Sequence, residues 1–476
     1  MRAINLDPKT IMMMLIMVLS SMVVENGLLN FLALLVLWLG IQLLWRPQFS
    51  PVFSFIFVYS WIQASIRIFQ ANILNLEINK LAEMGGDVYW ASALSLLGLA
   101  MLAIGMRFGL GRIDSFEQNE FRSELDGRPS LFWFYCYVAA LAFALILQVI
   151  TFVVPGLSQP IIALANLKWA FFWLFTHVAF SKAGTIRSLW FFAFCLEFVI
   201  GIGGFFSSFK TVIFFTILGM ISSGTRLNGR RIAALTLLSA VLITFGVAWT
   251  AIKGEQRGFL NQGVASQVVV VSFLDSIENI FSLTGNLNAT AMADAFMILI
   301  DRITYVELFG EVLDIVPLQI PYENGSLWGD AIARPFMPRL FFPEKSIIDE
   351  SLRTTEYVRR EFAGIDQGTQ VSLGYIADSY IDFGPWLMML PIMSVGWFMG
   401  RYYRWIVSLQ WCRGAIGAGL GTAALFQMSS IEISNTKLFG GLIISMLMSW
   451  IVAKWVVPMF YSPEMPAVSS TKPRGW

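Results

Sequence analysis

Residues 28–45 read LLNFLALLVLWLGIQLLW, an apolar run without a charged residue. An uncharged run of at least about 18 residues is typical of a transmembrane helix, because that length spans the hydrocarbon core of a bilayer. The rest of the chain has a similar character. Of its 476 residues 57% are hydrophobic and only 13% are charged, whereas soluble proteins carry about 25% charged residues. The sequence therefore predicts an all-α, polytopic integral membrane protein.

Further apolar runs bounded by charged residues, Pro or Gly indicate about 12 transmembrane helices in total. The first two are divided only by Glu25-Asn26-Gly27 and the eighth is short, so either could be tilted or re-entrant. The expected spans are residues 11–24, 28–45, 51–69, 88–106, 131–154, 161–180, 189–206, 211–223, 232–252, 385–400, 414–431 and 438–457.

The distribution of Lys and Arg sets the expected orientation, since positive residues are retained on the cytoplasmic side. A cytoplasmic N-terminus places most basic residues of the short connections inside, Arg226, Arg230 and Arg231 among them. The long ninth connection is then exported, and its amphipathic runs at 264–283 and 291–316 are typical of surface helices. The predicted organisation is residues 1–252 with spans 1–9, 253–384 as one large exported loop, 385–457 with spans 10–12, and 458–476 as a cytoplasmic tail.

Composition also excludes several classes of function. The net charge of +1 argues against a basic surface for nucleic acid. Three cysteines, all in or beside apolar segments, and a single histidine indicate neither a disulfide framework nor a Cys or His metal cluster. We expect no metal ion and no cofactor.

Basic residues concentrate in the second half of the predicted exported loop. Arg334 and Arg339 flank the prolines of Arg-Pro-Phe-Met-Pro-Arg, whose fixed φ angles favour a rigid, non-helical backbone. Arginine forks suit phosphate oxygens, and a lipid-linked pyrophosphate is the anion that this site would meet at the outer leaflet. Ordinary surface ion pairs are the alternative. The candidate anion-binding residues are Arg302, Arg334, Arg339, Lys345 and Arg360.

Acidic residues follow this basic stretch. Asp378 and Asp382 are four residues apart, a spacing that places both on one face of a helix, with Tyr375 beside them. A carboxylate near an arginine cluster could act as the general base for a sugar hydroxyl. The alternative interpretation of both aspartates is a solvated helix start.

Within the predicted spans, Glu197 is a functional candidate because an unpaired charge in the membrane is costly; its alternative state is protonated and buried. His177 lies toward the cytoplasmic end of its span, where we expect a structural role. The small residues from Gly396 to Gly400 predict close helix packing.

One late exported loop among many spans, together with a proline-rich basic stretch and a Gly-ending helix start, resembles the oligosaccharide repeat-unit polymerases of the O-antigen polymerase type. The resemblance in motif covers about residues 299–384, and elsewhere only the hydropathy is similar. The stretches that carry it are Ile320-Pro321, Gly325-Ser326, Arg334-Pro335, Pro338-Arg339, Pro343-Glu344-Lys345, Gly374-Tyr375 and Asp382-Phe383-Gly384.

The resemblance implies that a glycan on undecaprenyl pyrophosphate is transferred to the next lipid-linked repeat unit at the outer face of the bacterial inner membrane. Arg302, Arg334, Arg339 and Lys345 would then stabilise the leaving pyrophosphate. Asp378 would be the first choice of acceptor base, with Glu356 and Asp382 behind it. Related O-antigen ligases use a loop histidine, which this loop lacks. Expected partners are the lipid-linked oligosaccharide and membrane lipids, and could include a flippase and a chain-length regulator.

Two other functions remain open from the sequence. A glycosyltransferase that uses a polyprenyl-phosphate sugar could employ acidic residues of the first exported loop with a metal ion, and Glu77, Glu83 and Asp87 lie there. A transporter or flippase for a lipid-linked glycan or another solute could use charges within the membrane, Glu197 and Lys168 in particular.

Overall fold

The computed structural model describes the greater part of the chain, and all regular structure in that part is helical. Seven of the described helices are long and apolar enough to cross a membrane, or up to nine if each of two bent helix pairs is counted as one span. Three shorter apolar helices accompany them, Met12–Met22, Phe209–Ser222 and Ala415–Phe426. The described residues are 8–46, 51–111, 121, 123–182, 184–203, 209–223, 229–262, 270–337, 341–342, 344–345, 348–362, 370–412 and 414–460.

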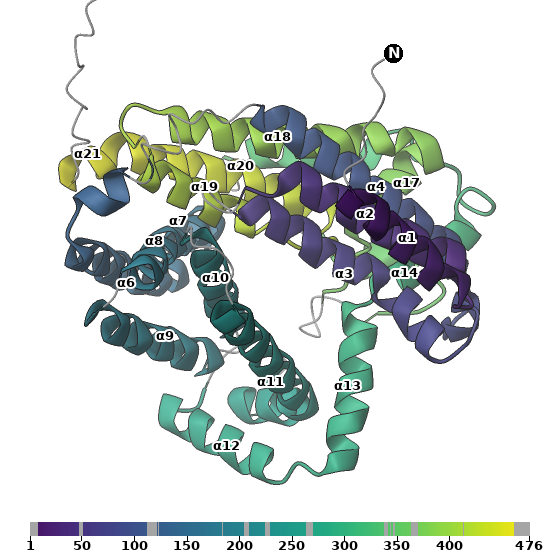
Figure 1. Cartoon of the computed structure of the whole chain (residues 1–476), viewed down its shortest axis with the longest axis horizontal. Helices are drawn as coiled ribbons and strands as arrows, with labels where there is room; N and C mark the ends of the chain where they lie inside the picture. Colours follow the sequence, from purple (N-terminus) through teal and green to yellow (C-terminus); the bar gives the residue numbers. More distant parts are fainter. Residues whose placement is uncertain are drawn as a thin grey trace, which may run out of the picture.

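One bundle combines the two ends of the chain (Figure 1). Its N-terminal members pack against one another and against the C-terminal helices, and α4 lies along α18. These elements are α1 (Pro8–Met22), α2 (Gly27–Leu44), α3 (Val52–Ile73), α4 (Val88–Leu110), α17 (Gly374–Leu387), α18 (Met389–Ser408), α19 (Ala415–Phe426), α20 (Asn435–Ile451), a π-helical turn (Val452–Val456) and α21 (Val457–Phe460).

Glycines allow α4 and α18 to approach closely. A Cβ atom at Gly396 would collide with the carbonyl oxygen of Leu102, and one at Gly400 with that of Met106. Gly105 on α4 meets the backbone of α18 in the same way. The close packing predicted for residues 396–400 is therefore confirmed, because only a residue without a side chain fits there.

A second group of helices packs beside this bundle through contacts of α19 with α8. A third group begins with the long helix α11; in Figure 1 α12 runs along the bottom of the molecule and α13 rises from it toward the bundle. The second group comprises α6 (Ser130–Val153), α7 (Ser158–Asn166), α8 (Lys168–Ser181), α9 (Ile186–Gly203) and α10 (Phe209–Ser222); the third comprises α11 (Gly229–Asn261), α12 (Phe273–Gly285) and α13 (Ala289–Ile303).

The boundaries of the 253–384 segment differ from those expected. Helix α11 continues to Asn261, beyond the boundary expected at 252. The run at 291–316 is divided at Thr304 into two helices, and α12 and α13 meet at an angle of 109°. At the other boundary, α17 and α18 are related by a bend of 118°, and Gly384 has a φ of 72°, a conformation that glycine adopts readily.

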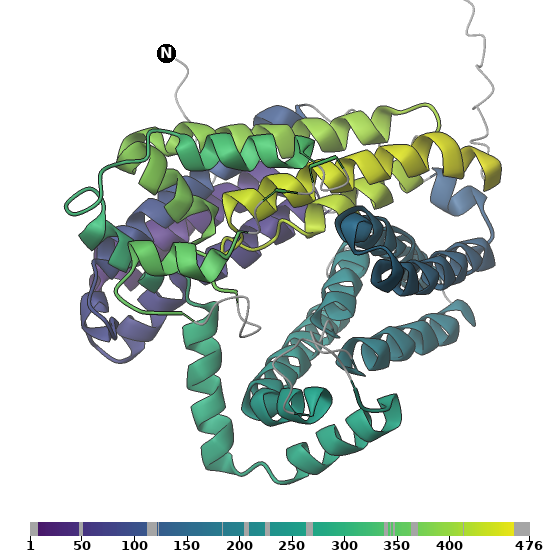
Figure 2. The ribbon, with the colours of Figure 1, turned by 180° about the vertical axis from the view of Figure 1, so that it is seen from behind.

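The remainder of the segment forms short helices that cover one end of the bundle. Helix α14 packs on α4, and α15 packs on α20 and α17. Figure 2 shows these green elements lying against the purple N-terminal helices. They are α14 (Val306–Ile315), α15 (Ser326–Ala333), a 3-10 turn (Arg334–Phe336) and α16 (Glu350–Tyr357).

Candidate functional site

Asp378 is the centre of a buried ionic network. Its side chain is fully buried on α17, and the Arg353 guanidinium of α16 donates to its two oxygens at 3.3 and 3.2 Å. The backbone N–H of Asn435, at the start of α20, donates to the same carboxylate at 2.9 Å. Glu350 lies 3.7 Å from Arg353 and accepts from the Ser434 hydroxyl at 2.8 Å. The network thus fastens α16 to α17 and α20.

The carboxylates of this network keep Arg353 in its charged form. Burial by itself would lower the pKa of Arg353, but the carboxylates of Asp378 and Glu350 outweigh it and raise the pKa of the guanidinium. Arg353 therefore stays charged, which a buried carboxylate needs in order to remain ionised at low cost. The predicted base Asp378 is held in this pair and is turned away from solvent.

Asp382, one turn further along α17, also has hydrogen-bond partners within the protein. Its carboxylate accepts from the backbone N–H groups of Leu327 and Trp328, at 3.1 and 2.8 Å. These are among the first N–H groups of α15, which have no partner within their own helix, so Asp382 caps α15 from a distant part of the chain. The Trp328 indole donates to the Ser379 hydroxyl at 3.0 Å and completes the contact.

Glu356 differs from the two aspartates because its side chain is exposed on α16. It forms no ion pair with any residue that the structure describes. The next residue, Tyr357, donates to the Glu323 carboxylate at 3.1 Å, and burial together with that carboxylate raises the pKa of Tyr357. Glu356 is therefore the only one of the three predicted bases that is exposed to solvent.

Most of the predicted anion-binding residues have protein partners. Arg334 donates to Asp330 at 2.7 Å, and the Lys345 ammonium donates to the carbonyl oxygens of Arg334 and Met337 at 2.7 and 3.0 Å. These contacts hold the proline-rich turn together. Arg339 lies outside the described residues.

Arg360 belongs to another acidic network, on α14. Its guanidinium donates to the fully buried Glu311 at 2.7 Å and lies 3.7 Å from both Glu307 and Glu83. The adjacent Arg359 pairs with Asp314 at 2.9 Å. These ion pairs join the residues that follow α16 to α14. Arg360, which was predicted to bind an anion, is therefore already paired with carboxylates.

Arg302, also predicted to bind an anion, lies near other basic residues. It is exposed at the end of α13, while the neighbouring Asp301 turns to Arg67 of α3 at 3.0 Å. Helix α11 packs on α13 and on α10. Burial lowers the pKa of Lys253 and Arg257 on α11, and the positive charge of Arg302 lowers both further; Lys210 of α10 also lowers the pKa of Lys253. We call Lys210, Lys253, Arg257 and Arg302 the cation cluster.

The cation cluster has an excess of positive charge. Among the residues that the structure describes, Lys210, Lys253 and Arg302 form no ion pair with a carboxylate. Within the described part of the chain these three cations have no carboxylate partner, and neighbouring like charges of this kind favour a bound anion. Lys210, Lys253 and Arg257 were not predicted, because Lys210 lies on α10 and the other two on α11, far from Arg302 in the sequence. The signal that could have found them is their shared position on one predicted side of the membrane.

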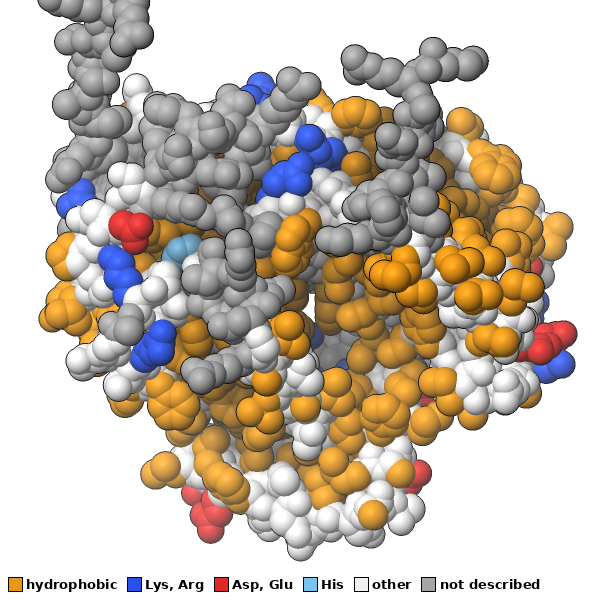
Figure 3. All heavy atoms as spheres, in the orientation of Figure 1, with side chains coloured by type: hydrophobic (Ala, Val, Ile, Leu, Met, Phe, Trp, Pro, Cys, Tyr) orange, Lys and Arg blue, Asp and Glu red, His pale blue; other side chains and the backbone are white. Residues whose placement is uncertain are grey.

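A hydrophobic surface lies beside the helices that carry the cluster. The face shown in Figure 3 is hollowed near its centre, between the arm formed by α10 and α11 and the bundle that contains α3, and hydrophobic side chains line its walls. Exposed apolar side chains also mark α13, among them Phe296, Met297 and Ile298. The combination of apolar walls and clustered cations is suited to an amphiphile with an anionic head.

The other candidate sites have ordinary structural partners. Glu197 pairs with Lys168 at 2.6 Å and accepts from the Tyr137 hydroxyl at 3.0 Å, all three side chains being buried. The His177 ring lies 3.0 Å from the Ser222 hydroxyl.

In the connection between α3 and α4, each acidic residue proposed as a metal ligand has another partner. Glu77 pairs with Lys80 at 3.2 Å, Glu83 lies near Arg360, and Asp87 caps α4 by accepting from the Trp90 N–H. Within the described part of the chain, no group of three or more His, Cys, Asp or Glu residues could hold a metal ion.

Comparison with known proteins gives one match. No curated protein and no solved structure matches the chain. A family profile described as "Domain of unknown function (DUF8712)" matches residues 87–456, which include the cation cluster and the whole 253–384 segment. The chain therefore belongs to the DUF8712 family.

Proposed function

We propose that the protein polymerises oligosaccharide repeat units carried on undecaprenyl pyrophosphate, at the outer face of a bacterial inner membrane. The observation that carries this proposal is the cation cluster on α10, α11 and α13, together with a hollow that has hydrophobic walls and lies between the arm of α10 and α11 and the bundle. A pyrophosphate on a long apolar chain matches both features, since ammonium and guanidinium groups bind phosphate oxygens and the walls are compatible with prenyl groups. The same function follows independently from the resemblance in residues 299–384.

The proposed topology has 12 membrane-spanning helices with both termini in the cytoplasm and residues 253–384 exported. The long apolar helices support it, as do the three shorter ones, which can cross with help from neighbouring helices or a locally thinner bilayer. The excess of Lys and Arg in the connections assigned to the cytoplasm supports the orientation.

The proposed reaction is a glycosyl transfer. A hydroxyl of the acceptor repeat unit attacks the anomeric carbon of the donor glycan, and the bond from that carbon to the pyrophosphate oxygen breaks. The cation cluster stabilises the charge that develops on the leaving undecaprenyl pyrophosphate. The exposed Glu356 accepts the proton of the hydroxyl, while Asp378 and Asp382 keep α15, α16 and α17 in position.

The proposed substrates are two lipid-linked units, one as donor and one as acceptor, and the reaction uses no metal ion or cofactor. A flippase that supplies the units and a regulator of chain length are the proposed protein partners.

Binding of undecaprenyl pyrophosphate to the purified full chain in lipid nanodiscs tests the proposal. The variant Lys253→Gln/Arg302→Gln should bind at least tenfold more weakly, because each lost charged contact is worth about 1.5–3 kcal/mol and about 1.4 kcal/mol is tenfold in affinity. Lys80→Gln is the matched control, since Lys80 is exposed and already paired with Glu77. Equal affinity of both variants and the unmodified protein would refute the assignment of the cluster.

A lipid-linked glycan transporter is the second candidate. The observation that favours it is the buried Lys168–Glu197 pair, with Tyr137, between α8, α9 and α6. A transporter would leave the length of the glycan unchanged, and Glu197→Gln would abolish movement of repeat units across the membrane. A polymerase with a structural pair would lose stability in that variant but would still form polymer.

A further inference from the structure

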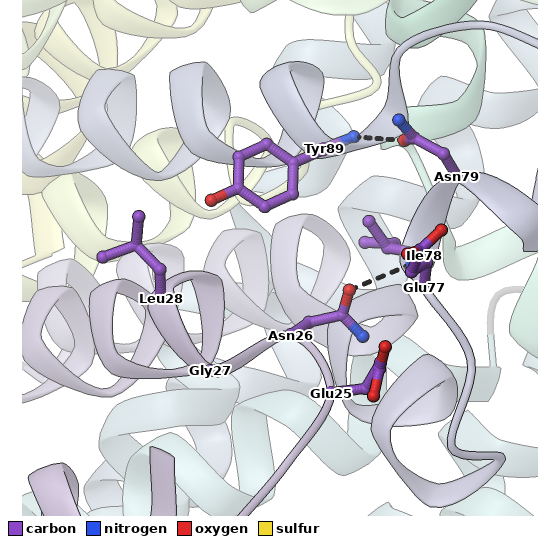
Figure 4. Close-up of a pocket in the computed structure, with 8 residues that line it drawn as sticks. All are labelled: Glu25, Asn26, Gly27, Leu28, Glu77, Ile78, Asn79 and Tyr89. Atoms are coloured by element: carbon purple, nitrogen blue, oxygen red, sulfur yellow. Dashed lines mark hydrogen bonds between the residues drawn. The ribbon is translucent and has the colours of Figure 1, made fainter. Parts of the chain in front are cut away.

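A pocket lies between the turn that joins α1 to α2 and the connection between α3 and α4 (Figure 4). Its volume is about 340 Å³, within the range of small-molecule sites. The residues that line it are Glu25, Asn26, Gly27, Leu28, Glu77, Ile78, Asn79 and Tyr89.

Hydrogen bonds of two asparagines fix the frame of this pocket. The Asn26 side chain accepts from the Ile78 N–H at 3.0 Å and donates to Asn72 and to the Leu76 carbonyl oxygen. Asn79 accepts from the Tyr89 N–H at 2.8 Å (Figure 4). Because these amides are engaged with the backbone, the pocket is formed before a ligand arrives.

Other polar groups of the pocket remain available. Within the described part of the chain, the Glu25 carboxylate and the Tyr89 hydroxyl have no hydrogen-bond or ion-pair partner. Glu77 is exposed, and Lys80, also exposed, is its one ion-pair partner among the described residues. The Tyr89 hydroxyl points toward Leu28, and these two side chains lie on one side of the view in Figure 4, with Glu25 and Glu77 on the other.

We propose that this pocket binds a neutral or amino sugar, and that it holds the acceptor glycan of the proposed polymerase. Carboxylates accept from hydroxyl and ammonium groups, and the ring and aliphatic wall can contact the apolar face of a sugar. The two carboxylates repel phosphate and uronic acids. The second part of this inference rests on the proposed function, whereas binding of the sugar does not.

The position of the pocket connects it with the 253–384 segment. Asp87 donates its N–H to the Gly310 carbonyl oxygen of α14 at 3.3 Å, and Glu83 of the same connection lies near Arg360. Arg67, near the end of α3 that leads to this connection, pairs with Asp301, the neighbour of Arg302. The pocket and the cation cluster therefore lie toward the same end of α3.

Saturation-transfer NMR on the full chain in nanodiscs tests the proposal, with methyl glucoside, glucosamine and glucuronate as probes. We expect binding of the first two and at least tenfold weaker binding of glucuronate. Glu25→Gln/Tyr89→Phe should weaken binding of methyl glucoside and glucosamine at least tenfold, and Glu278→Gln, an exposed acid on α12, should not. An unchanged melting profile shows that each variant is folded.

The proposal is overturned if neither methyl glucoside nor glucosamine binds, if glucuronate binds equally well, or if the double variant binds like the unmodified protein. The same samples are titrated with undecaprenyl pyrophosphate. Sugar binding with no effect of Lys253→Gln/Arg302→Gln on the lipid would refute the polymerase site and leave the sugar pocket standing. The reverse result would refute the pocket alone.

Discussion

Replacement of Arg353 by methionine should destabilise the protein strongly. The change removes the guanidinium 3.2 Å from Asp378, whose side chain is 0% exposed, and among the described residues leaves the Asn435 N–H as the remaining donor to that carboxylate. Glu350, 3% exposed in its side chain, loses the same counter-ion. Breaking a buried ion pair by removing one partner costs about 3–5 kcal/mol, so Arg353→Met should lower the free energy of unfolding by about that amount.

The assay is denaturant-induced unfolding in detergent micelles, with Arg334→Met as the matched control. Arg334 pairs with Asp330, whose side chain is 52% exposed, and such a pair is worth at most about 1 kcal/mol. Adding Asp378→Asn to Arg353→Met removes the stranded charge but keeps an acceptor for Asn435, so part of the stability should return. Equal losses in the two single variants, or a further loss in the double variant, would refute the reasoning.

Three further predictions concern packing, burial and binding. Gly105→Leu should disrupt the contact of α4 with α18 and reduce the yield of folded protein, whereas Gly440→Leu, which meets nothing within 4 Å, should not; equal yields would contradict the packing argument. Lys168→Met should cost about 3–5 kcal/mol by stranding Glu197, and adding Glu197→Gln should recover part of it; an unfolding curve like that of the unmodified protein would show that the pair is not needed. Affinity for undecaprenyl pyrophosphate should fall between 50 and 500 mM salt, because partly exposed charges are screened within about 10 Å at 0.1 M; an affinity independent of salt would argue against an electrostatic site.

Local composition was enough to predict the helical membrane architecture. Long apolar runs such as 28–45 gave helices, and Gly396 and Gly400 gave a close helix contact, because both features depend on residues near one another in the sequence. The bends were harder to predict. Between α12 and α13 the chain turns by 109° at a short polar break, and hydropathy alone does not give an angle.

The candidate site was less predictable, because charge pairing is decided by distant residues. Arg360 pairs with Glu311, 49 residues away, and Arg353 pairs with Asp378, 25 residues away. The basic stretch that was predicted to bind an anion is therefore largely neutralised. Arg302 shows the opposite case. Its neighbours in space are Lys253 and Arg257, far away in the sequence, and only the packing of α13 on α11 brings them together.

The most direct test of the proposed polymerase is the glycan profile of a strain in which the gene is disrupted and then restored with defined variants. We expect surface glycan limited to one repeat unit, with lipid-linked units accumulating on the outer leaflet, both in the disrupted strain and after restoration with Lys253→Gln/Arg302→Gln. The unmodified gene and Lys80→Gln should restore long chains. Chains of normal length in the disrupted strain, or repeat units trapped on the inner leaflet, would contradict a polymerase, and the second result would indicate a transporter.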